Sequence, residues 1–132
     1  MVICGQPYPV PGGGRYSFIA VDRLSVDTRV PGVALVSLSG EHELYSAHGL
    51  QERIESLLDD GLSIVIDLTE AVFLDSSIVA VLLKAQKLAS ERGRDYSVVL
   101  GESTGDPVRR MFEMTGLAHV LPIVERDEAR WS

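Results

Sequence analysis

The chain has 132 residues, of which 45% are hydrophobic and 23% charged, and its formal net charge is −7. These values predict a single soluble globular domain with a buried core, and they exclude a disordered chain. They also exclude two classes of partner, because no basic stripe is present to bind nucleic acid and no apolar run approaches the ~20 residues that cross a membrane.

Residues 1–20 are expected to form a flexible tail, and residues 21–132 the folded domain. Prolines and a run of three glycines interrupt any apolar stretch in this tail. We therefore expect neither a regular element nor a signal peptide there. Cys4 is the single cysteine of the chain and cannot form an internal disulfide. A reducing compartment is therefore predicted, and the cytoplasm fits best.

A β-hairpin and an amphipathic helix are predicted for the first half of the domain. Residues 24–28 alternate apolar with polar side chains, residues 33–38 are more fully apolar, and a Pro-Gly turn separates them. Apolar residues then recur at helical spacing from Ala47 to Leu57. Gly61 follows at the position where a left-handed residue commonly ends a helix.

Strands and helices alternate in the second half of the domain. Residues 62–68 and 96–100 are short and rich in branched side chains, as buried strands are, and residues 76–90 fit a helix. Residues 120–123 are predicted as the last strand, at an edge of the sheet because they include a proline. This alternation favours an α/β fold with parallel strand pairs.

A further helix is predicted between the last two strands. Asp106 is followed by Pro107, a residue favoured in the first helical turn, and is expected to be the N-cap. Gly116 is expected to end this helix.

The junction Asp75-Ser76-Ser77 stands between a predicted strand and the helix 76–90. Backbone N–H groups lack partners at a helix start, so a hydroxyl there can cap the helix, bind an anion or receive a phosphate. The apolar residues of the helix spread over roughly 200°, against about 100° for an ordinary stripe. Either the domain buries this helix on two sides, or part of it is a docking surface.

Catalytic and metal-binding patterns are not found in the sequence. Ser76 lacks the flanking glycines of a hydrolase nucleophile, and no histidine is placed to act as its base. Residues 41–43, Glu-His-Glu, bring three potential ligands together, but adjacent side chains cannot converge on one metal ion. We interpret them as a solvated loop. No catalytic residue, metal or cofactor is therefore expected, and the chain is interpreted as a non-enzyme.

Three blocks of the sequence resemble STAS domains, the family of the anti-sigma factor antagonists. The first comprises Val65-Ile66-Asp67-Leu68 and Phe73-Leu74-Asp75-Ser76-Ser77. Residues 38–43 look like the family's strand that ends in Gly-Glu-Leu-Asp, and residues 108–117 look like its penultimate helix. The resemblance covers roughly residues 22–125. It implies an α/β domain with a mixed sheet of about five strands and helices packed mainly on one side.

The resemblance also implies a regulatory switch. In bacterial antagonists the serine after the aspartate, here Ser76, is phosphorylated by an anti-sigma factor that is also a serine kinase, and Ser77 is the alternative acceptor. The unphosphorylated antagonist binds the anti-sigma factor and frees the sigma factor, and a PP2C-type serine phosphatase resets the cycle. The partner-binding site would comprise Asp75, Ser76, Ser77 and Ile78.

The chain departs from the family pattern at Ile78, where glycine is usual. Isoleucine suits a helix better than glycine by a fraction of a kcal/mol, so the fold is not affected. A branched side chain beside the serine is compatible with a blocked kinase, a different partner, or a member that is no longer phosphorylated. A constitutive STAS adaptor, and a module that binds a nucleotide or another anion at the helix start, are therefore alternatives.

Overall fold

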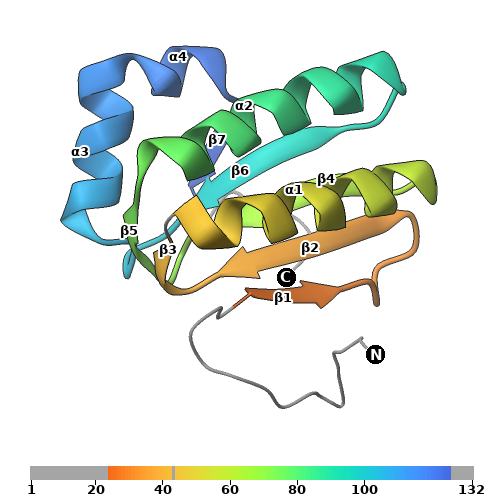
Figure 1. Cartoon of the computed structure of the whole chain (residues 1–132), viewed down its shortest axis with the longest axis horizontal. Helices are drawn as coiled ribbons and strands as arrows, with labels where there is room; N and C mark the ends of the chain where they lie inside the picture. Colours follow the sequence, from red (N-terminus) through yellow and green to blue (C-terminus); the bar gives the residue numbers. More distant parts are fainter. Residues whose placement is uncertain (1–23, 43, 126–132) are drawn as a thin grey trace.

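Helices cover one face of a mixed β-sheet in the computed structural model, which describes residues 24–42 and 44–125 (Figure 1). The predicted tail, residues 1–20, and its Cys4 lie outside the described residues. Within the described residues, the main sheet has five strands in the order β1-β2-β4-β6-β7. In chain order they are β1 Leu24–Asp27, β2 Val33–Leu38, β4 Ser63–Asp67, β6 Tyr96–Leu100 and β7 Ile123–Glu125.

This sheet confirms the predicted hairpin and the mixed topology. β1 and β2 pair antiparallel, with Val26 opposite Val36. β2, β4, β6 and β7 run parallel, as the alternation of strands and helices predicts. β7 lies at the edge, as expected from its neighbouring proline, but it begins at Ile123 because residues 117–120 form a short helix.

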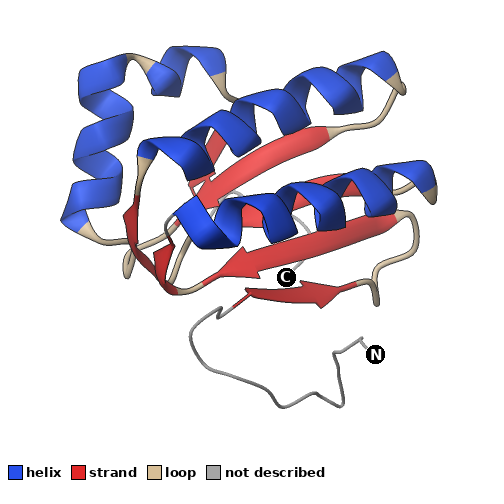
Figure 2. Cartoon of the chain, viewed as in Figure 1, coloured by secondary structure: helices blue, strands red, loops and turns tan. Residues whose placement is uncertain are grey.

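In the described residues, four helices connect the strands: α1 Leu44–Asp59, α2 Ser76–Glu91, α3 Asp106–Thr115 and α4 Leu117–Val120. α1 and α2 pack side by side over the sheet, and α3 stands at the end where α2 begins (Figure 2). Gly61 and Gly116 follow α1 and α3 with φ of 84° and 76°, as predicted. The predicted cap of α3 is wrong, because Gly105 is the N-cap and Asp106 is already helical.

The core lies between the main sheet and helices α1 and α2. Alternate side chains of β2 and β4 face the helices and are buried, namely Ala34, Val36, Leu38, Ile64 and Ile66. α2 adds five buried residues, and three more of its apolar residues, Val79, Leu83 and Leu88, pack partly buried against the core. The wide apolar surface of α2 is thus explained by burial within the domain.

The sequence pattern does not predict the second, two-stranded sheet. Its strand β3 (Gly40–His42) pairs in parallel with β5 (Ala71–Leu74). The interpretation of residues 41–43 as a solvated loop is therefore wrong, since His42 lies in a strand and is 1% exposed. Glu43 lies outside the described residues. Because β5 leads directly into α2, the small sheet positions the Asp-Ser-Ser junction.

Candidate functional site

Asp75 caps helix α2 through its side chain. Its backbone is extended (φ −94°, ψ −179°), and its Oδ1 accepts hydrogen bonds from the N–H groups of Ser77 and Ile78 at 3.0 and 3.3 Å. The Ser77 hydroxyl donates to the same oxygen at 2.5 Å. The carboxylate of Asp75 therefore fixes the start of the helix.

Ser76 is the first residue of α2 and is exposed to solvent. Among residues 24–42 and 44–125, its hydroxyl has no hydrogen-bond partner, whereas the hydroxyl of the half-buried Ser77 is bonded to Asp75. Modification of Ser76 therefore leaves no buried polar group unsatisfied. The geometry separates the two serines, because Ser76 is accessible to a reagent and Ser77 is part of the cap.

The backbone N–H groups of the first turn of α2 are largely occupied. Those of Ser77 and Ile78 donate to the Asp75 carboxylate, and that of Val79 donates to the Asp75 carbonyl at 3.2 Å. Anion sites at helix starts use free N–H groups, so an anion here would have to displace these bonds. The arrangement favours chemistry at the Ser76 hydroxyl over the anion-binding alternative.

The end of β3 supports the junction. The N–H of Asp75 donates to the carbonyl of His42 at 3.3 Å. The buried His42 ring has Nε2 3.1 Å from the Ser39 carbonyl oxygen and Nδ1 3.4 Å from the hydroxyl of Ser46 in α1. Nε2 is placed to donate to this carbonyl, and the Ser46 hydroxyl can either donate to or accept from Nδ1. His42 thus links β3, α1 and the start of α2, a role that the sequence analysis does not identify.

Ile78 does not lie on the surface. Its side chain is 0% exposed and belongs to the hydrophobic core. The prediction that Ile78 forms part of the partner-binding surface is therefore wrong, because this position of the helix faces the core. The same burial means that the branched side chain does not cover Ser76. The core absorbs the departure from the family's glycine.

Hydrogen bonds and an ion pair hold helix α3 beside the Asp-Ser-Ser junction. Arg109 Nη2 donates to the Gly101 carbonyl at 2.6 Å, and its Nη1 lies 3.1 Å from a carboxylate oxygen of Glu125 in β7. The hydrogen bonds of this pair raise the pKa of Arg109 and lower the pKa of Glu125. The N–H of Gly105 donates to the Ala71 carbonyl of β5 at 2.8 Å. α3 is thus held against the strand that leads to Ser76.

No group of three or more His, Cys, Asp or Glu side chains that could hold a metal ion is found in the part of the chain that the structure describes. Over the same residues, none of the helices combines the length and the apolar character that crossing a bilayer requires.

The mixed sheet, the small β3–β5 sheet and the capped start of α2 together define an α/β domain with an accessible serine at one end. A family model described as "Mlab, STAS domain" matches residues 26–125, and the chain belongs to the STAS domain family.

The chain is also similar to several proteins named as anti-sigma factor antagonists. The anti-sigma F factor antagonist of Paenibacillus polymyxa is 29% identical over 102 residues, which cover 73% of this chain and 81% of the relative. The anti-sigma-B factor antagonist of Listeria monocytogenes is 33% identical over 89 residues, which cover 67% and 75%. The crystal structure of an anti-sigma factor antagonist from Mycobacterium paratuberculosis superposes with a TM-score of 0.65 at 30% identity, over 82% of this chain and 89% of that one.

Proposed function

We propose that this protein is an anti-sigma factor antagonist, a cytoplasmic and non-enzymatic regulator that binds an anti-sigma factor with serine kinase activity and so releases a sigma factor. Phosphorylation of Ser76 ends the binding, and a PP2C-type serine phosphatase restores it. The names of the relatives support the antagonist role. The phosphorylation step rests on one observation, the exposed Ser76 hydroxyl at the start of α2, which has no partner among the described residues.

A phosphate on Ser76 is compatible with the fold. It adds about −1.5 to −2 charges at pH 7, and negative charge at a helix N-terminus is stabilising by roughly 0.3–1 kcal/mol. Because Ser76 is exposed, the phosphate oxygens stay hydrated in the free protein. In a partner surface matched to a neutral hydroxyl, by contrast, the added charge is a mismatch that weakens binding. The modification therefore changes the interface and spares the domain.

Two features of the junction favour Ser76 as the acceptor. The hydroxyl of Ser77 is bonded to Asp75, so a phosphate on Ser77 would disturb the helix cap. Ile78 is buried and leaves the approach to Ser76 open. Asp75 adds a neighbouring negative charge, which sharpens the contrast between the hydroxyl and the phosphate.

The direct test is incubation of the purified protein with ATP and the serine kinase encoded nearest its gene. We expect phosphate incorporation in the wild type and in the matched control Ser77→Ala, and none in Ser76→Ala. Mass spectrometry of the intact protein and of its peptides measures both. Incorporation into Ser76→Ala at the wild-type level would refute the assignment.

Binding of the same kinase distinguishes a switch from a constitutive adaptor. Wild type and Ser76→Ala are expected to bind, and Ser76→Asp to bind at least about tenfold more weakly, which corresponds to a loss of ~1.4 kcal/mol. Equal affinity of the three proteins would favour the adaptor. Calorimetric binding of a nucleotide to the protein alone would favour the anion-binding module.

A further inference from the structure

The face of the main sheet that points away from the helices has an apolar centre. Successive side chains of a strand point to opposite faces, and Val36 of β2 faces the helices. Leu35 therefore points the other way, as does Val65, its partner in β4. Val99 of β6 follows Ser97, the partner of Val65, by two residues and lies on the same face. We call Leu35, Val65 and Val99 the second face.

The second face is largely buried, although the helices lie on the other side of the sheet (Figure 2). Val99 is 0% exposed and Val65 8%, and neither is part of the hydrophobic core formed with the helices. Parallel sheets are usually covered on both faces, and a valine on an uncovered face keeps contact with water. Because the burial is present in a single chain, the cover does not require a second copy or another protein.

Burial of the second face increases toward the strand that precedes residues 126–132. Leu35 is partly buried, Val65 is more buried and Val99 is fully buried, in the order β2, β4, β6 across the sheet. β7 follows β6 at this edge and leads into residues 126–132, whereas residues 1–23 enter the sheet at β1, the opposite edge. The gradient therefore favours a cover that extends from the β7 side.

We infer that residues 126–132, which lie outside the described part of the chain, fold back over the second face, and that Trp131 covers Val65 and Val99. The six residues from Glu125 to Trp131 span at most ~20–22 Å. Two strand spacings, from β7 to β4, are only about 9–10 Å, so the segment is long enough. A tryptophan side chain buries about 150–250 Å² and is suited to cover two valines.

The start of this segment is held in place. Glu125 accepts hydrogen bonds from Nη1 and Nη2 of Arg109 in α3 at 3.1 and 3.2 Å. A segment tethered beside its docking surface binds at high effective concentration, so a few apolar contacts are enough. Docking closes the second face to other proteins and to other copies of the chain. This inference does not depend on phosphorylation of Ser76.

Fluorescence of the full chain tests the inference, because Trp131 is its single tryptophan. Emission of the native protein is expected to be shifted to shorter wavelength than that of the protein unfolded in urea. Acrylamide is expected to quench the native protein at least about threefold less, as it would with the segment docked in about two-thirds of the molecules or more. Neither value is expected to change on dilution.

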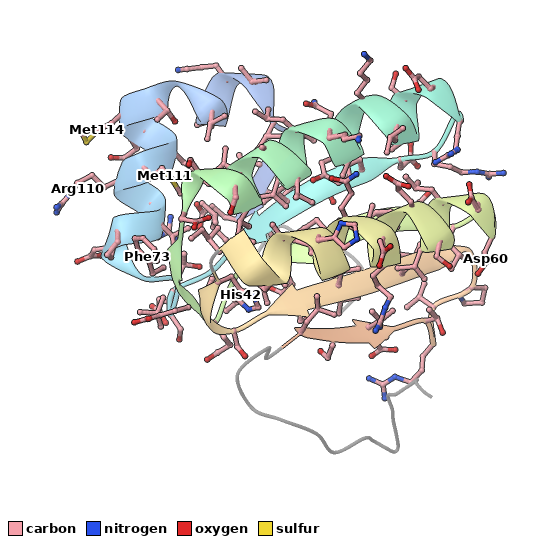
Figure 3. All side chains as sticks on the ribbon, viewed as in Figure 1. His42, Asp60, Phe73, Arg110, Met111 and Met114 are labelled. Atoms are coloured by element: carbon pink, nitrogen blue, oxygen red, sulfur yellow. The ribbon has the colours of Figure 1, made fainter. Side chains whose placement is uncertain are left out.

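Substitutions on the second face are expected to release the segment. Leu35→Thr and Val65→Thr each place a hydroxyl under the proposed cover and are expected to raise the quenching of Trp131 by acrylamide about twofold. Val72→Thr is the matched control, because Val72 is 48% exposed and lies in β5, outside the main sheet. Figure 3 shows the neighbouring Phe73 at the end of the molecule where α2 begins. The control is expected to leave the quenching unchanged.

Substitution of Trp131 itself gives a second measurement, which does not require a change in the sheet. Trp131→Ser is expected to raise the equilibrium constant for unfolding in urea about tenfold, and Trp131→Phe, which keeps an aromatic ring, less than about threefold. Circular dichroism follows the unfolding, because these variants have no tryptophan.

Four outcomes would overturn the inference. Native emission and quenching equal to those in urea would mean that Trp131 is not docked, and another segment would then cover the second face. Protection of Trp131 that is lost on dilution would assign the cover to a second copy. Protection that is the same in Val65→Thr, Leu35→Thr and the control would place Trp131 elsewhere on the domain. An unchanged unfolding equilibrium in Trp131→Ser would show that the side chain makes no stabilising contact.

Discussion

Helices α2 and α3 both start beside strand β5 and both have an aspartate at their beginning, but the two aspartates have different roles. Asp75 precedes α2 and caps it with its carboxylate. Asp106 is already the first residue of α3, and Gly105 before it has no side chain that could form a cap. The start of α2 is therefore fixed by side-chain hydrogen bonds, and the start of α3 by its backbone.

The packing around Gly105 explains this difference. A Cβ atom at this position would lie 2.6 Å from the carbonyl oxygen of Val72, so α3 approaches β5 more closely than a side chain permits. At α2, the Asp75 carboxylate binds the N–H groups and the Ser76 hydroxyl faces solvent. A side-chain cap thus fixes the start of α2 and close backbone packing fixes the start of α3, while the first helical residue, Ser76 or Asp106, is exposed at both.

The largest effect is expected from Gly105→Ala. The added methyl group meets the backbone of β5, which cannot move aside as a flexible side chain would, and we expect a loss of about 2–3 kcal/mol in the free energy of unfolding. Urea denaturation followed by circular dichroism measures it.

Gly49→Ala is the control for this substitution. Gly49 is exposed within α1, and a Cβ there would have nothing within 4 Å. The same chemical change is expected to stabilise the protein at this position, by about 0.5–1 kcal/mol. A loss of less than ~0.5 kcal/mol in Gly105→Ala would show that α3 can move away from β5 at little cost.

A smaller effect is expected from Asp75→Ala, which removes the cap of α2. Two N–H groups and the Ser77 hydroxyl lose their acceptor, and the expected loss is about 1–2 kcal/mol in the free energy of unfolding. Asp106→Ala is the matched variant. It removes only a charge near a helix N-terminus, with an expected loss of about 0.3–0.5 kcal/mol. Equal losses in the two urea curves would show that Asp106 caps α3 after all.

Most of the main sheet and helices α1, α2 and α3 can be predicted from the sequence, because apolar patterns and helix-end signals mark them, whereas the short helix α4 lies where no helix is predicted. The alternation in β2 and the helical spacing in α1 identify both elements, although α1 begins at Leu44 rather than at Ala47. β3 and β5 cannot be found in this way, because strands of three and four residues are too short to show a period. The cap of α3 is misassigned because the contact between Gly105 and β5 joins segments far apart in the chain.

The candidate site follows the same division. Ser76 and Asp75 can be placed because an apolar run ends and a helical pattern begins around them. The burial of Ile78 can be predicted as well, since Ile78 follows Ser76 by two positions and therefore points about 200° away from it around the helix. The burial of His42 cannot be predicted from the sequence, because it depends on contacts with α1 and with the β5–α2 junction. The local sequence pattern therefore locates the Ser76 hydroxyl, and only the tertiary structure shows that His42 supports the junction.

The smallest change in stability is expected at Ser76 itself. Ser76→Ala removes a hydroxyl without a partner among the described residues and is expected to alter the free energy of unfolding by less than about 0.5 kcal/mol. Ser76→Asp is expected to stabilise the protein by a few tenths of a kcal/mol at low salt, because a negative charge in the first helical turn is favourable. Ser77→Ala, which removes the hydroxyl bonded to Asp75, is the control and is expected to cost about 0.5–1.5 kcal/mol. Thermal unfolding of the three variants in parallel measures these differences.

A loss of more than ~1 kcal/mol in the free energy of unfolding of Ser76→Asp would mean that charge at this position strains the domain. Phosphorylation would then act by loosening the fold, and the separation between a stable domain and a switchable interface would not hold.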